Sequence, residues 1–257
     1  MQLIRLDTPE GRFYHPISGV YSPTGVLQLY PSVTTVLKAV PIPKLAELEL
    51  ALGKEVLNQL SDWGGRRGSV MHQYLENYFI CLQKTNNPEQ CLLYTQKKTL
   101  QDLSQMATDD KALRVGRDLF YNYYYEGYLE RVSKIFFTEK FIWSNQHQYA
   151  GTLDFACVNT HGQRVIVDFK SANSTKDEAT IHKYFLQGAA YSIAFEEHYH
   201  QSIDQIEIWV SSKSGIEEYV LNGAELTQKR KEYIHWVEDY HQKWQPQDII
   251  SKYYKSQ

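Results

Sequence analysis

The stretch YAGTLDFACVNTHGQRVIVDFKSANSTK, residues 149–176, contains two short apolar segments on either side of a polar turn centred on His161. Apolar runs of this length bounded by turn residues predict two strands of a hairpin. Each strand carries one aspartate near its middle, Asp154 and Asp168, and Lys170 follows the second aspartate by two residues. The second strand is otherwise apolar on both faces, which predicts that it is buried. Three charged side chains in such strands require a chemical explanation.

A hairpin that is symmetric about His161 places Asp154 directly opposite Asp168, with Cβ atoms about 5 Å apart. Like charges in that position destabilise the sheet unless a cation compensates them. Lys170 shares a strand face with Asp168, because side chains two residues apart point the same way. Oxygen ligands of this kind suit Mg²⁺ or Mn²⁺. A solvent-facing hairpin is the alternative, and the apolar composition of 165–169 argues against it.

Composition narrows the class of protein. The chain has 257 residues, of which 42% are hydrophobic and 22% charged, and this is typical of a soluble globular protein. No apolar run is as long as the segment that a membrane-spanning helix needs, and residues 1–16 do not resemble a signal or transit peptide. Cys81, Cys91 and Cys157 form no CxxC pair, so we expect a reducing compartment, with no disulfide framework and no iron–sulfur cluster. We therefore expect a soluble intracellular (cytoplasmic) protein without a membrane partner. The net charge of −3 gives no general attraction to nucleic acid, although carboxylates that bind cations can make a nucleic-acid enzyme acidic.

Hydrophobic periodicity predicts one α/β (α+β) domain over residues 1–257. A mainly helical part, 30–133, precedes a sheet core, 135–222, and a C-terminal helix, 224–245. Residues 1–31 are expected to be short extended pieces, broken at Gly11, Pro16, Pro23 and Gly25. The further expected elements are a short helix within 30–40 capped by Ser32 or Thr34, helices at 44–60, 66–83 and 89–133, strands at 134–144, 149–158 and 164–172, a helix at 181–199, and strands at 204–212 and 216–222.

Four segments together resemble a known family. GTLDFACV and RVIVDFKSA resemble the GxxD and (D/E)xK core of the PD-(D/E)XK phosphodiesterase superfamily. RRGSVMHQYLE (66–76) is similar to the GxxxHxxxE helix of its RecB-like branch, and KYFLQGAAYSIAFEE (183–197) is similar to that branch's QxxxY helix. YPSVTTVL (30–37) resembles the PSVT segment of the mitochondrial genome maintenance exonucleases and related phage and bacterial nucleases. The four segments occur in the family's order.

The resemblance implies a restriction-endonuclease-like core with a mixed central sheet flanked by helices, and Mg²⁺ or Mn²⁺ as cofactor. It implies four metal ligands, namely His72, Asp154, Asp168 and the Phe169 carbonyl. Lys170 is then the catalytic lysine. Gln187 and Tyr191 lie four residues apart on one helix face, where they could hold the lysine, a water or the DNA backbone.

Two acidic residues have open roles. Glu76 lies one turn after His72, and it either orients that histidine from behind the metal or is a solvated helix residue. Glu139, on the strand before Asp154, has the same ambiguity and a weaker claim. The HYH segment (198–200) has ligand spacing, but a polar helix end is the more frequent occurrence of such a pattern.

Candidate substrate contacts lie around these motifs: Arg66, Arg67, Ser171, Ser174 and Lys183, with further cations at Lys97, Lys98, Lys111, Arg114 and Arg117. Any of these cations can equally belong to a solvated surface. The tyrosine-rich segment 121–128 could stack the bases of a single strand. The helical spacing of Leu119, Phe120, Tyr124, Tyr128 and Val132 favours a core helix instead.

The resemblance implies a metal-dependent DNA exonuclease that prefers single-stranded DNA with free ends, and the absence of a base-reading module from the sequence favours little sequence specificity. The PSVT-type resemblance implies that the helical part arches over the strand. We expect single-stranded DNA as the partner, and replication or recombination proteins as further partners; cleavage polarity and oligomeric state stay open. A structure- or sequence-selective endonuclease on the same core, or a non-catalytic nucleic-acid-binding protein, are the alternatives. No P-loop is present in the sequence, so any motor would be a separate protein.

Overall fold

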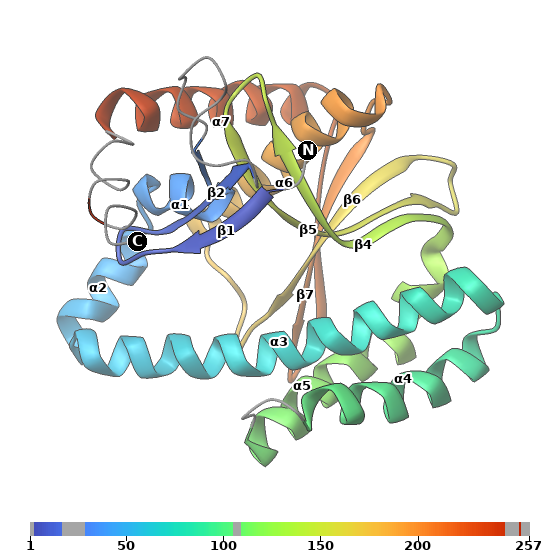
Figure 1. Cartoon of the computed structure of the whole chain (residues 1–257). Coiled ribbons are helices and arrows are strands. Elements are labelled where there is room, and N and C mark those ends of the chain that lie inside the picture. Colours follow the sequence, from blue (N-terminus) through green and yellow to red (C-terminus); the bar gives the residue numbers. More distant parts are fainter. Residues whose placement is uncertain (1–2, 17–28, 105–108, 245–251, 253–257) are drawn as a thin grey trace.

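The computed structural model describes residues 3–16, 29–104, 109–244 and 252, and it contains two β-sheets (Figure 1). The larger sheet has the strand order β4-β5-β6-β7-β8, so neighbours in the chain are neighbours in the sheet. Its strands are β4 (Val132–Ser144), β5 (Tyr149–Asn159), β6 (Arg164–Ser171), β7 (Gln205–Ser212) and β8 (Gly215–Asn222). Only β6 and β7 pair in parallel among these strands, because helix α6 (Glu178–Tyr199) connects them across one face of the sheet. The predicted mixed sheet is confirmed.

Helices cover both faces of this sheet (Figure 1). On one face, α6 and α7 (Gly223–Lys243) pack with α1 (Val33–Val36) and the short helix η1 (Leu37–Ala39) around an aliphatic and aromatic core. On the other face, α3 (Lys54–Thr85), α4 (Pro88–Leu103) and α5 (Asp110–Tyr125) enclose a second, more aromatic core. The predicted α/β class with helices flanking a mixed sheet is therefore confirmed.

The β5–β6 hairpin has the register that the sequence predicts. Its pairs run from Val158–Arg164 to Phe155–Val167, and all of them are symmetric about His161. Gly162 supplies the left-handed backbone of the turn, with φ of 79°. The ladder stops one residue short of the two aspartates, where the Phe169 N–H donates to the Asp154 carboxylate over 2.9 Å. A side chain thus replaces the next rung of the ladder.

Helix α3 differs from the prediction. It runs without interruption through 61–65, a segment that contains Gly64 and Gly65, whereas separate helices were expected at 44–60 and 66–83. A Cβ on either glycine would meet no neighbouring atom within 4 Å, so close packing does not explain them. The helix continues because its second half, from Arg67 to Cys81, is buried against the sheet, and packing outweighs the low propensity of two glycines.

The remaining helices and strands of the N-terminal part follow the prediction with small shifts. Strands β1 (Leu3–Asp7), β2 (Arg12–Pro16) and β3 (Tyr30–Pro31) form a separate three-stranded sheet. Of the two candidate caps of α1, Ser32 is the one whose hydroxyl accepts the Thr35 N–H, over 3.0 Å. The expected breaks at Pro23 and Gly25 lie outside the described residues, as does position 245 at the end of the last helix.

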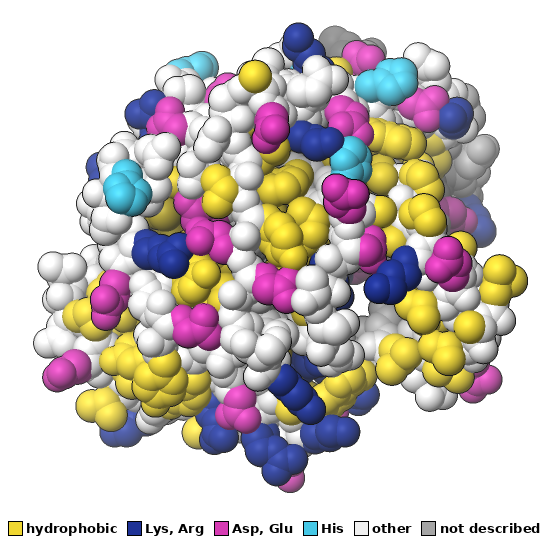
Figure 2. Space-filling model, turned by 180° about the vertical axis from the view of Figure 1, so that it is seen from behind, with side chains coloured by type: hydrophobic (Ala, Val, Ile, Leu, Met, Phe, Trp, Pro, Cys, Tyr) yellow, Lys and Arg dark blue, Asp and Glu magenta, His cyan; other side chains and the backbone are white. Residues whose placement is uncertain are grey.

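Two helical segments end differently from the prediction. The expected helix at 89–133 consists of α4, α5 and the short helix η2 (Tyr128–Arg131), with 105–108 outside the description. The expected helix at 44–60 is divided at Gly53, whose φ is 81°, into α2 (Pro43–Leu52) and the start of α3. No side chain of α2 is buried. Figure 2 shows hydrophobic side chains gathered where α2 and the start of α3 lie, and positive and negative side chains interspersed elsewhere on that face.

The tyrosine-rich helix α5 is a core helix. Leu119, Phe120 and Tyr128 are buried, and Tyr123, which the helical spacing did not include, is buried as well. Tyr125 is exposed at the end of the helix. Among the described residues, no helix is both long enough and apolar enough to cross a bilayer.

Candidate active site

A cleft of about 620 Å³ lies between helix α3 and the ends of strands β4, β5 and β6. The cleft is lined by two glycines and by mainly polar and charged side chains: Gly65, Gly68, Ser69, His72, Gln73, Glu76, Glu139, Thr152, Phe169, Lys170 and Ser171. A smaller cavity of about 360 Å³ contains the buried Glu207. The carboxylate of Glu207 already accepts from Gln205 and Trp209, so that cavity offers no free acidic oxygen. The chemistry of the chain is concentrated in the larger cleft.

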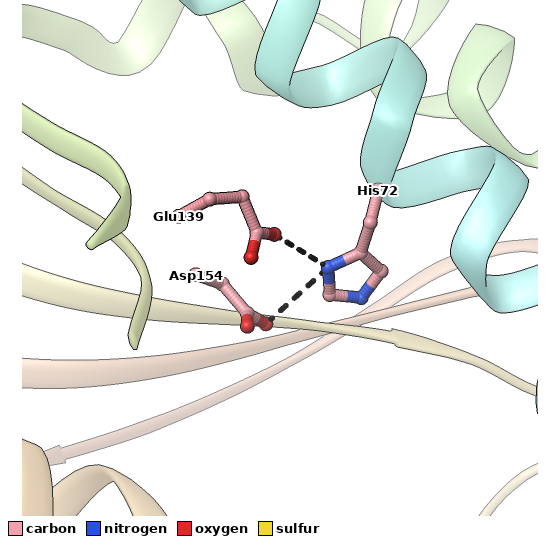
Figure 3. Close-up of side chains that lie close together, drawn as sticks. All are labelled: His72, Glu139 and Asp154. Atoms are coloured by element: carbon pink, nitrogen blue, oxygen red, sulfur yellow. Dashed lines mark hydrogen bonds and ion pairs between the residues drawn. The ribbon is translucent and has the colours of Figure 1, made fainter. Parts of the chain in front are cut away.

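His72 projects from α3 toward two carboxylates on the sheet (Figure 3). Its Nδ1 lies 3.1 Å from Glu139 Oε1 and 3.8 Å from Asp154 Oδ2, and its Nε2 lies 3.0 Å from the Phe169 carbonyl oxygen. Both ring nitrogens therefore face acceptors, which only the doubly protonated ring can satisfy. Burial lowers the pKa of His72, but the charges of Asp154 and Glu139 outweigh it and raise this pKa to about 9. In the metal-free protein the ring is an imidazolium at neutral pH.

The backbone of Glu139 is unusual for a strand residue. Its φ is 46°, in the left-handed region that a non-glycine residue rarely adopts. The flanking pairs, Thr138–Phe155 and Lys140–Leu153, keep Glu139 opposite Asp154. Such a conformation costs about 1–2 kcal/mol and persists only where the surroundings determine it. The strain coincides with the contact between Glu139 and His72.

Buried Asp168 forms an ion pair next to this group with Lys170, whose side chain is 20% exposed. Lys170 Nζ lies 2.6 Å from Asp168 Oδ2 and donates to Gln187 Oε1 over 3.3 Å, and it lies 4.9 Å from the centre of the Tyr184 ring. Asp168 is only 1% exposed, and its other oxygen, Oδ1, accepts no hydrogen bond from the described residues. Burial raises the pKa of Asp168 to about 6, against the opposing effect of Lys170 and with a further rise from Asp154.

Helix α6 supports the lysine from behind. Gln187 contacts Lys170 directly, whereas Tyr191 is buried in the core and packs against strand β5. A Cβ at Gly151 would lie 2.9 Å from the Tyr191 ring, so this close contact requires glycine there. Burial raises the pKa of Tyr191 well above its ordinary value. The structure thus brings Gln187 to Lys170 and buries Tyr191 in the core.

The donor set fits a divalent cation. His72, Glu139 and Asp154 each offer one ligand atom, and these atoms all lie within 4.8 Å of one another. One imidazole nitrogen and carboxylate oxygens suit Mg²⁺ or Mn²⁺. The unpartnered Oδ1 of buried Asp168 is the further sign of a missing cation, because such an oxygen is costly without a partner.

This group differs from the expected ligand set. It includes Glu139, which the sequence ranks low, and it does not include Asp168, whose Oδ2 is paired with Lys170. The Phe169 carbonyl, expected on the metal, accepts from His72 instead. Glu76 accepts from Gln73 over 3.0 Å, and among the described residues Glu139 is the acidic partner of His72 that makes a hydrogen bond. The register opposite Asp154 was the sequence signal that could have favoured Glu139.

The expected substrate contacts occupy different surroundings. Arg66 is 53% exposed and pairs with Asp109 over 3.3 Å, whereas Arg67 is buried. Ser171 lines the cleft, Ser174 is exposed, and Lys183 is half-buried with a pKa lowered by burial.

The cations farther from the cleft are partly neutralised. Lys98 pairs with Asp102, and Arg117 pairs with Asp118. Within the HYH segment, His198 bonds to the Trp143 carbonyl oxygen over 2.7 Å, as a helix-end residue would.

One family model matches the part of the chain that contains this site. The family model described as the PD-(D/E)XK nuclease superfamily matches residues 47–248. A search of the curated proteins gave no match. Among solved structures, the chain is similar to one described as a "Putative exonuclease" from Eubacterium rectale, with 14% identity and a TM-score of 0.45 over 68% of this chain and 65% of that one. It is also similar to the structure of SSO0001, with 16% identity and a TM-score of 0.31 over 60% of this chain and 71% of that one. Because the family match covers most of the sequence and includes every residue of the cleft, the chain belongs to the PD-(D/E)XK nuclease superfamily.

Proposed function

We propose that the protein is a metal-dependent DNA exonuclease that hydrolyses phosphodiester bonds, prefers single-stranded DNA with free ends and has little sequence specificity. The observation that carries this proposal is the convergence of a His–Glu–Asp ligand group and an Asp168–Lys170 ion pair at one cleft, which His72, Glu139 and Lys170 line. This is the combination that phosphodiester hydrolysis requires: a place for a cation and a fixed ammonium beside it.

His72, Glu139 and Asp154 would hold the ion, and the unpartnered Oδ1 of Asp168 is a further candidate oxygen ligand. When bound, Mg²⁺ or Mn²⁺ polarises the scissile phosphate, lowers the pKa of a water and offsets negative charge in the transition state. The Phe169 carbonyl keeps its hydrogen bond from His72 Nε2, which fixes the ring and leaves Nδ1 directed at the carboxylates. His72 must lose its Nδ1 proton for this to occur.

Lys170 acts as the fixed positive charge of the reaction. Burial lowers its pKa, but the Asp168 and Asp154 carboxylates outweigh burial and keep the pKa above its ordinary value, so the side chain remains an ammonium. Asp168 and Gln187 hold the ammonium on two sides. From that position Lys170 donates a hydrogen bond to the attacking water or to the oxygen on which negative charge develops. Tyr191 supports Gln187 from the core.

The cleft is an open groove beside α3, and we propose that Ser171 and Lys183 contact phosphates along it, with Ser174 at its outer end. Lys183 lies one turn before Gln187 on the same face of α6. Arg66 stays outside this set because Asp109 neutralises it. Among the described residues we find no base-reading module, which supports an enzyme with little sequence specificity. Such an enzyme would act in DNA repair or recombination. Replication or recombination proteins are the proposed partners.

The preference for free ends separates an exonuclease from an endonuclease with the same site. The test is digestion of linear and covalently closed single-stranded DNA of one sequence with Mg²⁺ or Mn²⁺. We expect the linear strand to be degraded and the circle to persist. Equal digestion of the circle would establish the endonuclease alternative.

A matched variant tests catalysis itself. Lys170→Met should abolish digestion while binding of the same oligonucleotide persists. If the wild-type protein binds but does not cleave under any divalent metal, it is a non-catalytic binding protein.

A further inference from the structure

Arg67 is a buried cation without an acidic partner. It is 5% exposed in helix α3, and its Nη1 donates to the side-chain oxygen of Asn173. Its Nε has no hydrogen-bond partner, and no carboxylate lies within ion-pair distance of it in the described part of the chain. Burial lowers the pKa of Arg67. A buried charge is normally paired, so the surroundings of Arg67 lack an anion.

A second cation lies in the segment to which Asn173 belongs, three residues after it. Lys176 is half-buried in the segment between β6 and α6, and its pKa is lowered by burial and by the positive charges of Arg67 and Lys44. The nearby acids are engaged elsewhere. Asp177 caps α6 by accepting the Thr180 N–H over 2.9 Å, and Glu217 accepts the Thr175 and Tyr219 hydroxyls over 2.6 and 2.7 Å. The Arg67–Asn173 hydrogen bond thus joins α3 to the segment that carries Lys176, and among the described residues neither cation forms an ion pair with a carboxylate.

We propose that Arg67 and Lys176 form an anion subsite for a phosphate of the substrate strand next to the scissile one. The proposal rests on the proposed function for the identity of the strand, and on the chemistry of the two cations for the phosphate. A guanidinium fork and an ammonium match the oxygens of a phosphate group. Asn173, which accepts from Arg67, follows Lys170 by three residues, so the subsite adjoins the catalytic ion pair.

Gly68 and Ser171 connect the surroundings of Arg67 to the cleft. Gly68 follows Arg67 and lines the cleft, and a Cβ there would lie 3.3 Å from the Ser171 hydroxyl, which also lines it. A strand that passes Ser171 would therefore lie beside Gly68, the helix residue that follows Arg67. Arg66, the neighbour of Arg67 in sequence, points to solvent and pairs with Asp109, so it provides a matched control of the same charge.

The first experiment measures anion binding without metal or turnover. The melting temperature is recorded in EDTA with inorganic phosphate, against chloride at the same ionic strength. Phosphate should stabilise the wild type and Arg66→Gln, and should not stabilise Lys176→Gln, whose partly exposed position makes a folding defect unexpected. Arg67→Gln should behave like Lys176→Gln if it folds. Equal stabilisation of Lys176→Gln and the wild type would overturn the subsite.

The second experiment follows a labelled 12-mer of single-stranded DNA in EDTA at several salt concentrations. Loss of one phosphate contact should weaken binding about tenfold and reduce the slope of log affinity against log salt by about 0.7. Arg66→Gln should keep the wild-type slope, and a wild-type slope in Lys176→Gln would contradict the proposal.

Oligonucleotides with 5′-phosphate, 3′-phosphate or hydroxyl ends identify the source of the phosphate. An effect of the Lys176 substitution on all of them assigns an internal diester, and an effect on one end only assigns a terminal phosphate. Because no cleavage is measured, these results stand even if the protein proves inactive as a nuclease.

Discussion

Metal binding should release a proton from His72, and pH is the perturbation that reveals it. In the metal-free protein both ring nitrogens contact acceptors, and the carboxylates raise the pKa of the ring to about 9. A cation at Nδ1 takes the place of one proton. Because the free protein holds that proton more tightly at lower pH, metal affinity must fall as the pH falls below 9.

The magnitude follows from the size of the shift. Because pH 7 is about two units below the pKa of His72, displacement of its proton at pH 7 costs about 2.7 kcal/mol, which is about 100-fold in metal affinity. The side chain of His72 is 26% exposed, so solvent screening makes this an upper value. Affinity should rise up to tenfold for each pH unit between about 6 and 9 and then level off. Below about 6, protonation of Asp168 should make the dependence steeper, because its pKa is raised to about 6.

Titration calorimetry with Mn²⁺ between pH 6 and 8.5 measures both quantities. Titrations at pH 7 in two buffers with different ionisation enthalpies should report about one proton released per ion. His72→Gln should bind more weakly and lose the dependence between pH 6.5 and 8.5. Glu139→Gln should move the dependence to lower pH, because one of the charges that raise the pKa of His72 is gone. A wild-type affinity that is constant from pH 6.5 to 8.5 would refute the reasoning.

Three substitutions test the remaining parts of the site. Lys170→Met should reduce phosphodiester hydrolysis by at least about 100-fold, with an unchanged circular dichroism spectrum and with Mn²⁺ binding retained in calorimetry. Asp168→Asn should also inactivate, yet raise the unfolding free energy of the metal-free protein at pH 7–8 by up to about 3 kcal/mol, because the raised pKa means that the buried charge opposes folding there; a lower melting temperature in EDTA would contradict this. Gly151→Ala should destabilise by about 1–3 kcal/mol and lower activity by displacing Tyr191, whereas Gly64→Ala, in open space on α3, should stabilise by up to about 1 kcal/mol in the same urea titration.

The hairpin and its register could be predicted from the sequence because they depend on local information. A turn centred on His161, with Gly162 available for a left-handed residue, and the two-residue period of a strand fix which positions face each other. The same period brings Lys170 to Asp168. Packing on both faces of the second strand was visible in its composition, and its burial followed from that.

What could not be predicted depends on contacts between distant segments. The sequence ranks Glu139 below Glu76 as a partner of His72, whereas in the structure Glu139, with its left-handed backbone, makes the hydrogen bond to the ring. Arg66 and Arg67 are adjacent and chemically identical, yet one is exposed and the other buried, because the rotation between neighbouring residues of a helix turns one toward the protein. Tertiary packing also keeps α3 helical through Gly64 and Gly65, which have low helix propensity.

The position of the active site follows from how strand β6 is paired. Its pairs with β5 end at Val167, whereas its pairs with β7 continue through Asp168, Phe169 and Lys170 to Ser171. Over these last residues β6 is held rigidly on one side and free on the other. Phe169 uses its free N–H for Asp154 and its C=O for His72, so the backbone groups that the ladder leaves unpaired orient the two ligands. If β6 separated from both neighbouring strands, the Phe169 N–H and C=O would bond to water. If β6 stayed paired with both strands, these two groups would already be used in the sheet and could not bond to Asp154 and His72. The carboxylates, the histidine and the lysine therefore meet where one ladder stops and the other continues.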